Sequence, residues 1–262
     1  VYLGASLSKM KTKDGGECLT MSSDIYCQAA VTTLEEKLAT ESKRLPTKCY
    51  NPIMANYKPE LDTSPELKAD GLQYYQKLIG VLRWAVEIGR VDIFLETSLL
   101  SSHLALPRIG HLEQVIHIFG YLKAHPKRKL AFDPVHPQIS EDRFPKHDWE
   151  CLRNYMSTHC FKDAGRAPND ETNRRSQTGI LIFCNRAPIV WYNKRQNSVE
   201  ASTFGSEFTA LKTAVELVEA LQYKLRMFGV PLLGATNMYC DDEAVFKNVS
   251  NPTSMLRKKH HS

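Results

Sequence analysis

The chain has 262 residues, of which 42% are hydrophobic and 24% are charged, close to the averages of folded globular proteins. This composition excludes a disordered polymer, a collagen and a small disulfide scaffold. Lysine and arginine number 34 against 29 for aspartate and glutamate, and the resulting net charge of +5 permits a polyanionic partner without requiring one. No apolar run approaches the roughly 20 residues of a membrane span, and no signal peptide is visible.

The seven cysteines are widely spaced and form no CxxC pair, which favours a reduced, intracellular protein. We expect Cys160, Cys184 and Cys240 to be small core residues inside strands. The chain begins with Val1 rather than with Met, so we expect a piece of a longer product.

The first half of the chain is predicted to contain two short strands, a helix, a proline-rich extended linker, a helical region and a charged loop. The two strands are predicted over 1–7 and 17–21, and the helix over 24–38. The extended linker covers 40–70, the helical region 71–124 and the charged loop 133–150. Within the helical region, Tyr75, Leu78, Ile79, Leu82 and Val86 recur at steps of three and four, which is typical of an amphipathic helix.

From about residue 155 the pattern changes to strands separated by one long helix and one short helix. The predicted strands cover 156–162, 179–184, 188–192 and 236–240, and the predicted helices cover 203–228 and 242–249. Asn185 and Arg186 form the turn between the second and third strands, and Gly229 and Pro231 end the long helix. This order predicts an α/β fold with a mixed β-sheet.

Glu207 stands out because it lies on the apolar stripe of the predicted long helix. The stripe continues at steps of four and three through Leu211, Ala214, Val218, Leu221 and Leu225. The polar side of the same helix carries Lys212, Glu216, Glu219, Tyr223 and Arg226. A carboxylate on a core-facing stripe is costly unless positive charge meets it. Glu207 is therefore either a functional carboxylate or a capping residue near the helix start.

Two further carboxylates, Asp163 and Asp241, each end a predicted strand. In an open α/β sheet, ligands collect where strand ends lie beside a helix N-terminus, so these two residues and Glu207 could meet there. Mg²⁺ or Mn²⁺ would offset the repulsion between three carboxylates, and two such ions can support phosphodiester hydrolysis. Taken singly, each aspartate could equally be a turn residue.

Basic residues flank the same region. Arg174 and Arg175 precede the strand that starts at Gly179, and Lys194 and Arg195 follow its partner. Such pairs could hold nucleic-acid phosphates, or they could form a solvated surface.

Five sequence blocks resemble the RNase H region of copia-type LTR retrotransposon polyproteins. They are CFKDA (160–164), RRSQTG (174–179), IVWYNKRQ (189–196), ASTFGSEF (201–208) and CDDEA (240–244). Upstream, residues 75–80, 92–93 and 121–123 are similar to the segment that joins reverse transcriptase to RNase H. Residues 2–4 resemble the start of the thumb region.

The resemblance implies an RNase H-like mixed sheet flanked by helices over 155–262, preceded by a remnant of the thumb over 1–60 and a helical connection over 61–135. It implies that Asp163, Glu207 and Asp241 are catalytic carboxylates that bind Mg²⁺ or Mn²⁺. The implied activity is hydrolysis of RNA in RNA–DNA hybrids. The implied partners are the hybrid and the upstream polymerase palm of the same polyprotein, with no membrane or small-molecule substrate. The implied location is a cytoplasmic virus-like particle or the nucleus.

The chain departs from the family pattern at three points. Gly165 replaces a second aspartate, Asp242 replaces an asparagine, and the chain stops at Ser262, before another strand, a helix and a fourth aspartate. We therefore expect a C-terminally incomplete domain with weak or no RNase H activity. The alternative is an inactive, decayed retrotransposon fragment with at most nucleic-acid binding.

Overall fold

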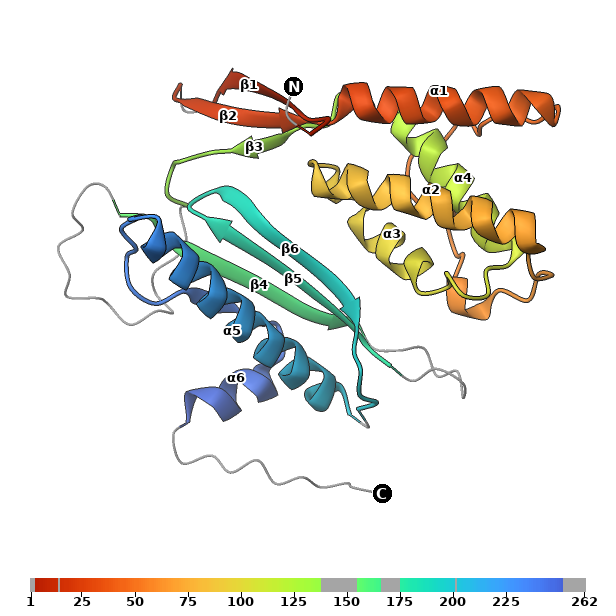
Figure 1. Cartoon of the computed structure of the whole chain (residues 1–262). Helices are drawn as coiled ribbons and strands as arrows, with labels where there is room; N and C mark the ends of the chain where they lie inside the picture. The colour runs from red at the N-terminus through yellow and green to blue at the C-terminus, as the bar shows by residue number, and fades with distance from the viewer. Residues whose placement is uncertain (1–2, 14, 138–154, 166–174, 201, 252–262) are drawn as a thin grey trace. The chain divides into compact units, whose positions relative to one another are not determined.

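The structure is a computed structural model that describes residues 3–13, 15–137, 155–165, 175–200 and 202–251 (Figure 1). The chain divides into two compact units, Val1–Ala131 and Phe132–Ser262. The boundary predicted between residues 60 and 61 falls inside the first unit. No helix in the described ranges is long and apolar enough to cross a membrane.

The first unit consists of a small sheet and a group of packed helices. Its sheet has the strand order β1-β2-β3, with bounds β1 (Ser6–Lys11), β2 (Glu17–Ser22) and β3 (Leu130–Phe132). Its α-helices are α1 (Asp24–Thr40), α2 (Ala69–Glu87), α3 (Phe94–Ser101) and α4 (Ile109–Ala124). Two short 3₁₀ helices, η1 (Pro59–Leu61) and η2 (Val91–Ile93), lie between them. The strand predicted over 17–21 and the helices predicted after it are confirmed for this unit.

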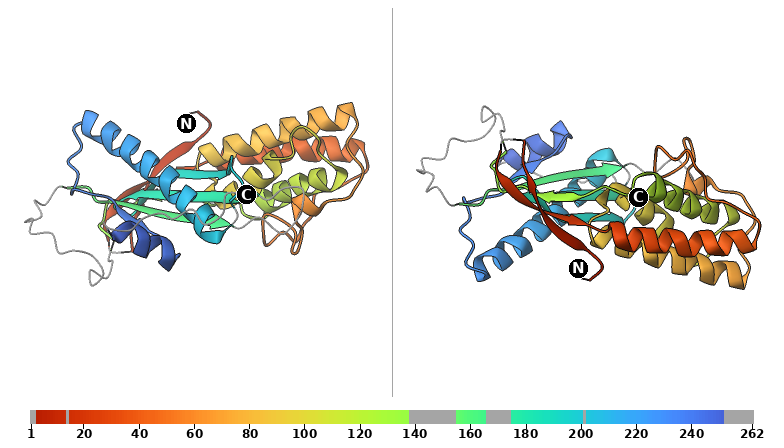
Figure 2. Two further views of the ribbon diagram at one scale, coloured as in Figure 1. Left: turned by 90° about the horizontal axis from the view of Figure 1, so that it is seen from below. Right: turned by 90° about the horizontal axis from the view of Figure 1, so that it is seen from above.

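Helix α4 forms the centre of the first unit because its sequence carries few charges and many large apolar residues. Val115, Ile118 and Phe119 are fully buried, and α1, α2 and α3 all contact this helix. Figure 2 shows α1, α2 and α4 running side by side. Burial of this much apolar surface is the main stabilising contribution to such a helical group.

Two expectations for the first unit need correction. The proline-rich segment 40–70 is irregular, but it packs: Leu45 and Cys49 are buried, and the Cys49 thiol lies 3.7 Å from Nδ1 of His117. The strand predicted over 1–7 begins later than expected, because residues 3–4 form a turn and β1 covers Ser6–Lys11. Proline density describes the local backbone, and it does not determine whether a segment finds a surface to pack against.

The second unit is a four-stranded mixed sheet with one long and one short helix. The strands are β4 (Thr158–Gly165), β5 (Gln177–Cys184), β6 (Ala187–Arg195) and β7 (Asn237–Tyr239). The helices are α5 (Thr203–Met227) and α6 (Glu243–Ser250). The strand order is β6-β5-β4-β7, in which only β7 runs parallel to its neighbour β4. The predicted α/β class and mixed sheet are confirmed.

The core of the second unit lies between α5 and one face of this sheet (Figure 1). The sheet contributes Cys160, Ile180 and Ile182, and the helix contributes Ala214 and Val218. These strand residues follow the two-residue period of a strand with one buried face. The β5–β6 hairpin turns at Asn185, whose φ of 52° is a conformation that asparagine tolerates. The predicted turn and the predicted long helix are therefore both confirmed.

Candidate functional site

Helix α5 places Glu207 in the interior of the second unit. The Ser202 side chain caps this helix by accepting a hydrogen bond from the Gly205 N–H at 3.1 Å. Glu207 follows about one turn later and is only 4% exposed. The predicted stripe is confirmed at Ala214 and Val218, whereas Leu211 is half-buried. Glu207 is thus a buried carboxylate on the core face of α5.

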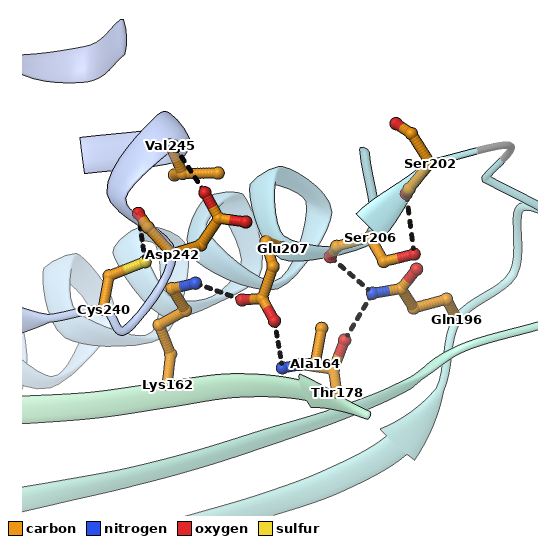
Figure 3. A network of polar contacts seen from close by, with 10 residues as sticks. All are labelled: Lys162, Ala164, Thr178, Gln196, Ser202, Ser206, Glu207, Cys240, Asp242 and Val245. Carbon is orange, nitrogen blue, oxygen red and sulfur yellow. Dashed lines mark hydrogen bonds and ion pairs between the residues drawn. The ribbon is translucent and has the colours of Figure 1, made fainter. Parts of the chain in front are cut away.

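Two donors from β4 meet this carboxylate (Figure 3). The Lys162 ammonium donates to one Glu207 oxygen, and the Ala164 backbone N–H donates to the other at 3.2 Å. The Lys162 side chain is fully buried, and the Glu207 side chain is nearly so. Sequence reasoning missed Lys162, although it lies two residues after the core residue Cys160 and therefore shares its face of the strand.

Asp163 lies on the other face of β4. Burial alternates along this strand, so that Lys162 and Ala164 are buried and Asp163 between them is exposed. Successive side chains of a strand point to opposite faces of the sheet, which directs Asp163 away from the face that carries Glu207. The structure brings together two of the three predicted carboxylates, and Asp163 is not grouped with them.

Asp241 reaches Glu207 because β4 and β7 are parallel. Their shared direction places the residues after β7 beside the end of β4. Potential ligand atoms of Glu207, Cys240 and Asp241 all lie within 4.8 Å of one another. The next residue, Asp242, caps α6 by accepting from the Val245 N–H at 2.8 Å. Cys240 was expected to be a core residue, but it is only half-buried and lies in this acidic group.

Lys162 supplies the positive charge that offsets the buried Glu207. Burial alone would lower the pKa of Lys162, but its interactions with Cys240 and Glu207 outweigh burial and raise that pKa above its ordinary value. By contrast, burial raises the pKa of the Cys160 thiol to about 11, so this cysteine is an inert core residue as predicted.

The described residues around Glu207 can be tested against the pair of divalent cations that the sequence predicts. A pair of Mg²⁺ or Mn²⁺ ions about 4 Å apart needs several carboxylates directed at one place. Among the described residues, only Glu207, Cys240 and Asp241 form a possible ligand group, and a thiol is one of the three. Both Glu207 oxygens already accept hydrogen bonds from β4. The described residues therefore do not fit a pair of divalent cations.

The predicted basic residues lie at the same end of the sheet. Across the strands, Ala164 pairs with Thr178 and Thr178 pairs with Lys194. Neighbouring strands are about 4.8 Å apart, so Lys194 is on the order of 10 Å from β4, whose Ala164 N–H bonds Glu207. Arg195 pairs with Gln177, and Arg175 is exposed two residues before Gln177. Arg174 lies outside the described residues.

A pocket of about 210 Å³ lies beside these cations. Its lining is polar and positively charged: Thr178, Tyr192, Lys194, Arg195, Gln196, Asn197, Ser198, Thr209 and Thr213. Gln196 joins the pocket to α5, because its amide donates to the Thr178 hydroxyl at 3.0 Å and to the Ser206 carbonyl at 2.8 Å (Figure 3). Sequence reasoning did not single out Gln196, whose role depends on contacts between separate elements.

Comparison with known proteins finds sequence similarity to retrotransposon proteins. The chain is 24% identical over 202 residues to a retrovirus-related Pol polyprotein from transposon RE1 of Arabidopsis thaliana. It is 27% identical over 190 residues to one from transposon TNT 1-94 of Nicotiana tabacum. It is 38% identical over 184 residues to a transposon Ty5-1 protein of Saccharomyces cerevisiae. No family model and no solved structure matches significantly.

The homologues of this chain are Pol polyproteins of copia-type retrotransposons. The matches cover 77%, 71% and 69% of the chain for the Arabidopsis, tobacco and yeast proteins, respectively. In turn, they span 12% of each plant polyprotein and 53% of the yeast protein. The resemblance noted from the sequence blocks is therefore confirmed at the level of the polyprotein.

Proposed function

We propose that the second unit is the RNase H-type domain of a copia-type Pol polyprotein and that it engages RNA–DNA hybrids. The observation that carries this proposal is the meeting of Glu207 from α5 and Asp241 from the end of β7 at one edge of a mixed sheet. Ligands of open α/β sheets bind at such edges. The homology to Pol polyproteins supports a nucleic-acid substrate.

Charge and spacing support the hybrid as the ligand. Arg175, Lys194 and Arg195 lie within a few strand spacings of the acidic residues. Lysine and arginine hold nucleic-acid phosphates and so fix a strand in register, while other groups act on it or read it. A phosphate held in the pocket at Lys194 would bring the adjoining backbone of the same strand toward Glu207 and Asp241.

We propose that cleavage by this chain is weak, because Asp163 faces away from Glu207 and a lysine neutralises Glu207. The alternative is metal-dependent hydrolysis through Asp163, Glu207 and Asp241, as the family resemblance implies. The proximity of Glu207 to Asp241 favours this alternative, and the orientation of Asp163 opposes it.

The first unit, on this proposal, comes from the thumb and the connection segment that precede RNase H in the polyprotein. Its expected partner is the polymerase palm of the same polyprotein, and its expected location is an intracellular virus-like particle. The sequence similarity to Pol polyproteins supports both expectations.

The test is binding of a labelled RNA–DNA hybrid by the full chain, with duplex DNA and duplex RNA as competitors. Replacing Lys194 and Arg195 together by alanine should weaken hybrid binding and lower the slope of log Kd against log salt by about 2, since each lost phosphate contact contributes about 0.9. Lys212→Ala, which removes an exposed charge on the polar side of α5, is the matched control and should leave both values unchanged.

The same samples test the cleavage alternative when Mg²⁺ or Mn²⁺ is added. Slow or absent cleavage is expected. Rapid cleavage that is lost in Asp163→Asn, Glu207→Gln and Asp241→Asn would establish the metal-dependent alternative. Equal binding of all three duplexes, unaffected by the Lys194 and Arg195 substitutions, would refute the proposed hybrid site.

A further inference from the structure

The group formed by Glu207, Cys240 and Asp241, called the acidic centre below, already contains a cation, the Lys162 ammonium. The Lys162 ammonium is fully buried and bonded to Glu207, and it also interacts with Cys240. Glu207 and Cys240 are two of the three residues whose ligand atoms lie within 4.8 Å of one another. Lys162 is therefore placed inside the group of ligands that would hold a divalent cation.

The hydrogen bonding of Glu207 leaves little opportunity for a second cation. One carboxylate oxygen accepts from Lys162 and the other accepts from the Ala164 N–H. A divalent cation would have to approach to about 2.1 Å from such an oxygen and would repel an ammonium a few ångströms away. Moreover, a buried carboxylate that lost Lys162 would need another positive charge.

We propose that Lys162 takes the place and the charge of a divalent cation at Glu207, so that the centre closes without metal and binds one tightly only when this ammonium is removed. Lys162 is thus the residue that determines whether the centre uses metal. This inference goes beyond the proposed engagement of hybrids and does not depend on it, because it concerns only the contacts of Glu207.

The direct test is a Mn²⁺ titration of the full chain followed by electron paramagnetic resonance, without nucleic acid. The wild-type chain is expected to bind Mn²⁺ weakly at this centre. Lys162→Met removes the ammonium and keeps an unbranched side chain, and it should bind one Mn²⁺ at least tenfold more tightly. Lys212→Met removes one exposed lysine from the same unit and should resemble the wild type.

A second substitution locates the gain. Adding Glu207→Gln to Lys162→Met should abolish the new Mn²⁺ site, since the carboxylate is its ligand. Thermal melts of the single and the double variant, run once in EDTA and once in Mn²⁺, give a second readout. In EDTA, Lys162→Met should melt below the wild type. Mn²⁺ should raise the Tm of Lys162→Met and leave the Tm of the double variant unchanged.

Two results would overturn the proposal. One is a wild-type chain that binds a single Mn²⁺ as tightly as Lys162→Met does, with the site lost in Glu207→Gln. The other is a folded Lys162→Met chain that gains no Mn²⁺ site.

If Lys162→Met does not fold, Lys162→Gln removes the charge and keeps a donor for Glu207. The same tenfold gain is then expected, and its absence would count equally against the proposal. Loss of hybrid binding, by contrast, would leave these outcomes unaffected.

Discussion

At the scale of single residues, buried ion pairs in both units are held by additional hydrogen bonds. Arg90 in the first unit is 1% exposed and bonds Asp92 through two nitrogens, at 2.8 and 2.9 Å. The Tyr121 hydroxyl donates to the same carboxylate at 3.1 Å. Lys162 and Glu207 have a similar relation in the second unit, with the Ala164 N–H as the extra donor. Such pairs are costly to break, because the surviving partner keeps an uncompensated buried charge.

The Arg90–Asp92 pair predicts how stability depends on pH. Burial alone would raise the pKa of Asp92, but hydrogen bonds and charge from Arg90, together with Tyr121, outweigh burial and hold that pKa below its ordinary value. A lowered pKa in the folded state contributes stability that is present above the unfolded pKa, near 3.8, and is lost as pH falls through the folded pKa.

We therefore expect Asp92→Asn to lower the free energy of unfolding of the first unit by about 3–5 kcal/mol at pH 7. The difference between wild type and variant should shrink as the pH falls below about 4, as measured by urea unfolding at several pH values. A difference that stays constant from pH 7 to pH 2 would show that the Asp92 charge does not contribute. Glu113→Gln, an exposed acid on α4, serves as the control.

At the scale of elements, helix α5 combines two roles on one face. Its first turns carry Glu207 toward the end of β4, and its middle buries Ala214 and Val218 against the sheet. The packing of the middle fixes the rotation of the helix about its axis, and this rotation in turn directs Glu207 inward. The position of the carboxylate thus depends on apolar contacts that lie two to three turns away.

Substitutions on the two faces of α5 should differ sharply. Val218→Asp places an unpaired charge in the core and should destabilise the second unit by at least about 3 kcal/mol. Lys212→Asp changes an exposed residue, and its effect should stay near 0.5 kcal/mol, mostly from repulsion with Glu216 one turn on. Thermal melts followed by circular dichroism measure both effects, and equal losses of Tm would show that the assigned faces are wrong.

At the scale of the whole molecule, the two units have separate cores. The first is centred on α4, with Phe119 and Ile118 fully buried, and the second lies between α5 and the sheet. Units with separate cores often unfold in separate transitions, and a single stability value then does not describe the chain.

Phe119→Ala tests this separation. Removal of a fully buried aromatic ring should cost the first unit about 3–5 kcal/mol. In calorimetry of the full chain, we expect one transition to move to lower temperature while the other keeps its midpoint. Hybrid binding, measured below both transitions, should be unchanged. A shift of both midpoints by the same amount would mean that the units unfold together.

The sequence by itself determined the features that depend on short-range periodicity. The three-and-four spacing of apolar residues predicts α2 and α5, and it also places Glu207 on the buried stripe of α5. Asn185 marks the β5–β6 turn because it tolerates a positive φ. Each of these features is set by neighbours within a few residues along the chain.

Only the tertiary structure decided which face of β4 meets Glu207. Lys162 and Asp163 are adjacent and both charged, so charge alone does not determine which of them is buried. The local signal is that Lys162 lies two residues after Cys160, and its use requires knowing that Cys160 faces the core. The choice follows from pairing with β5 and from packing against α5, which together place Lys162 on the face of Glu207 and Asp163 on the opposite one. A shift of one residue in that register would exchange them, because side chains alternate along a strand. The composition of the acidic centre is therefore a consequence of strand register, which is fixed by contacts between distant segments.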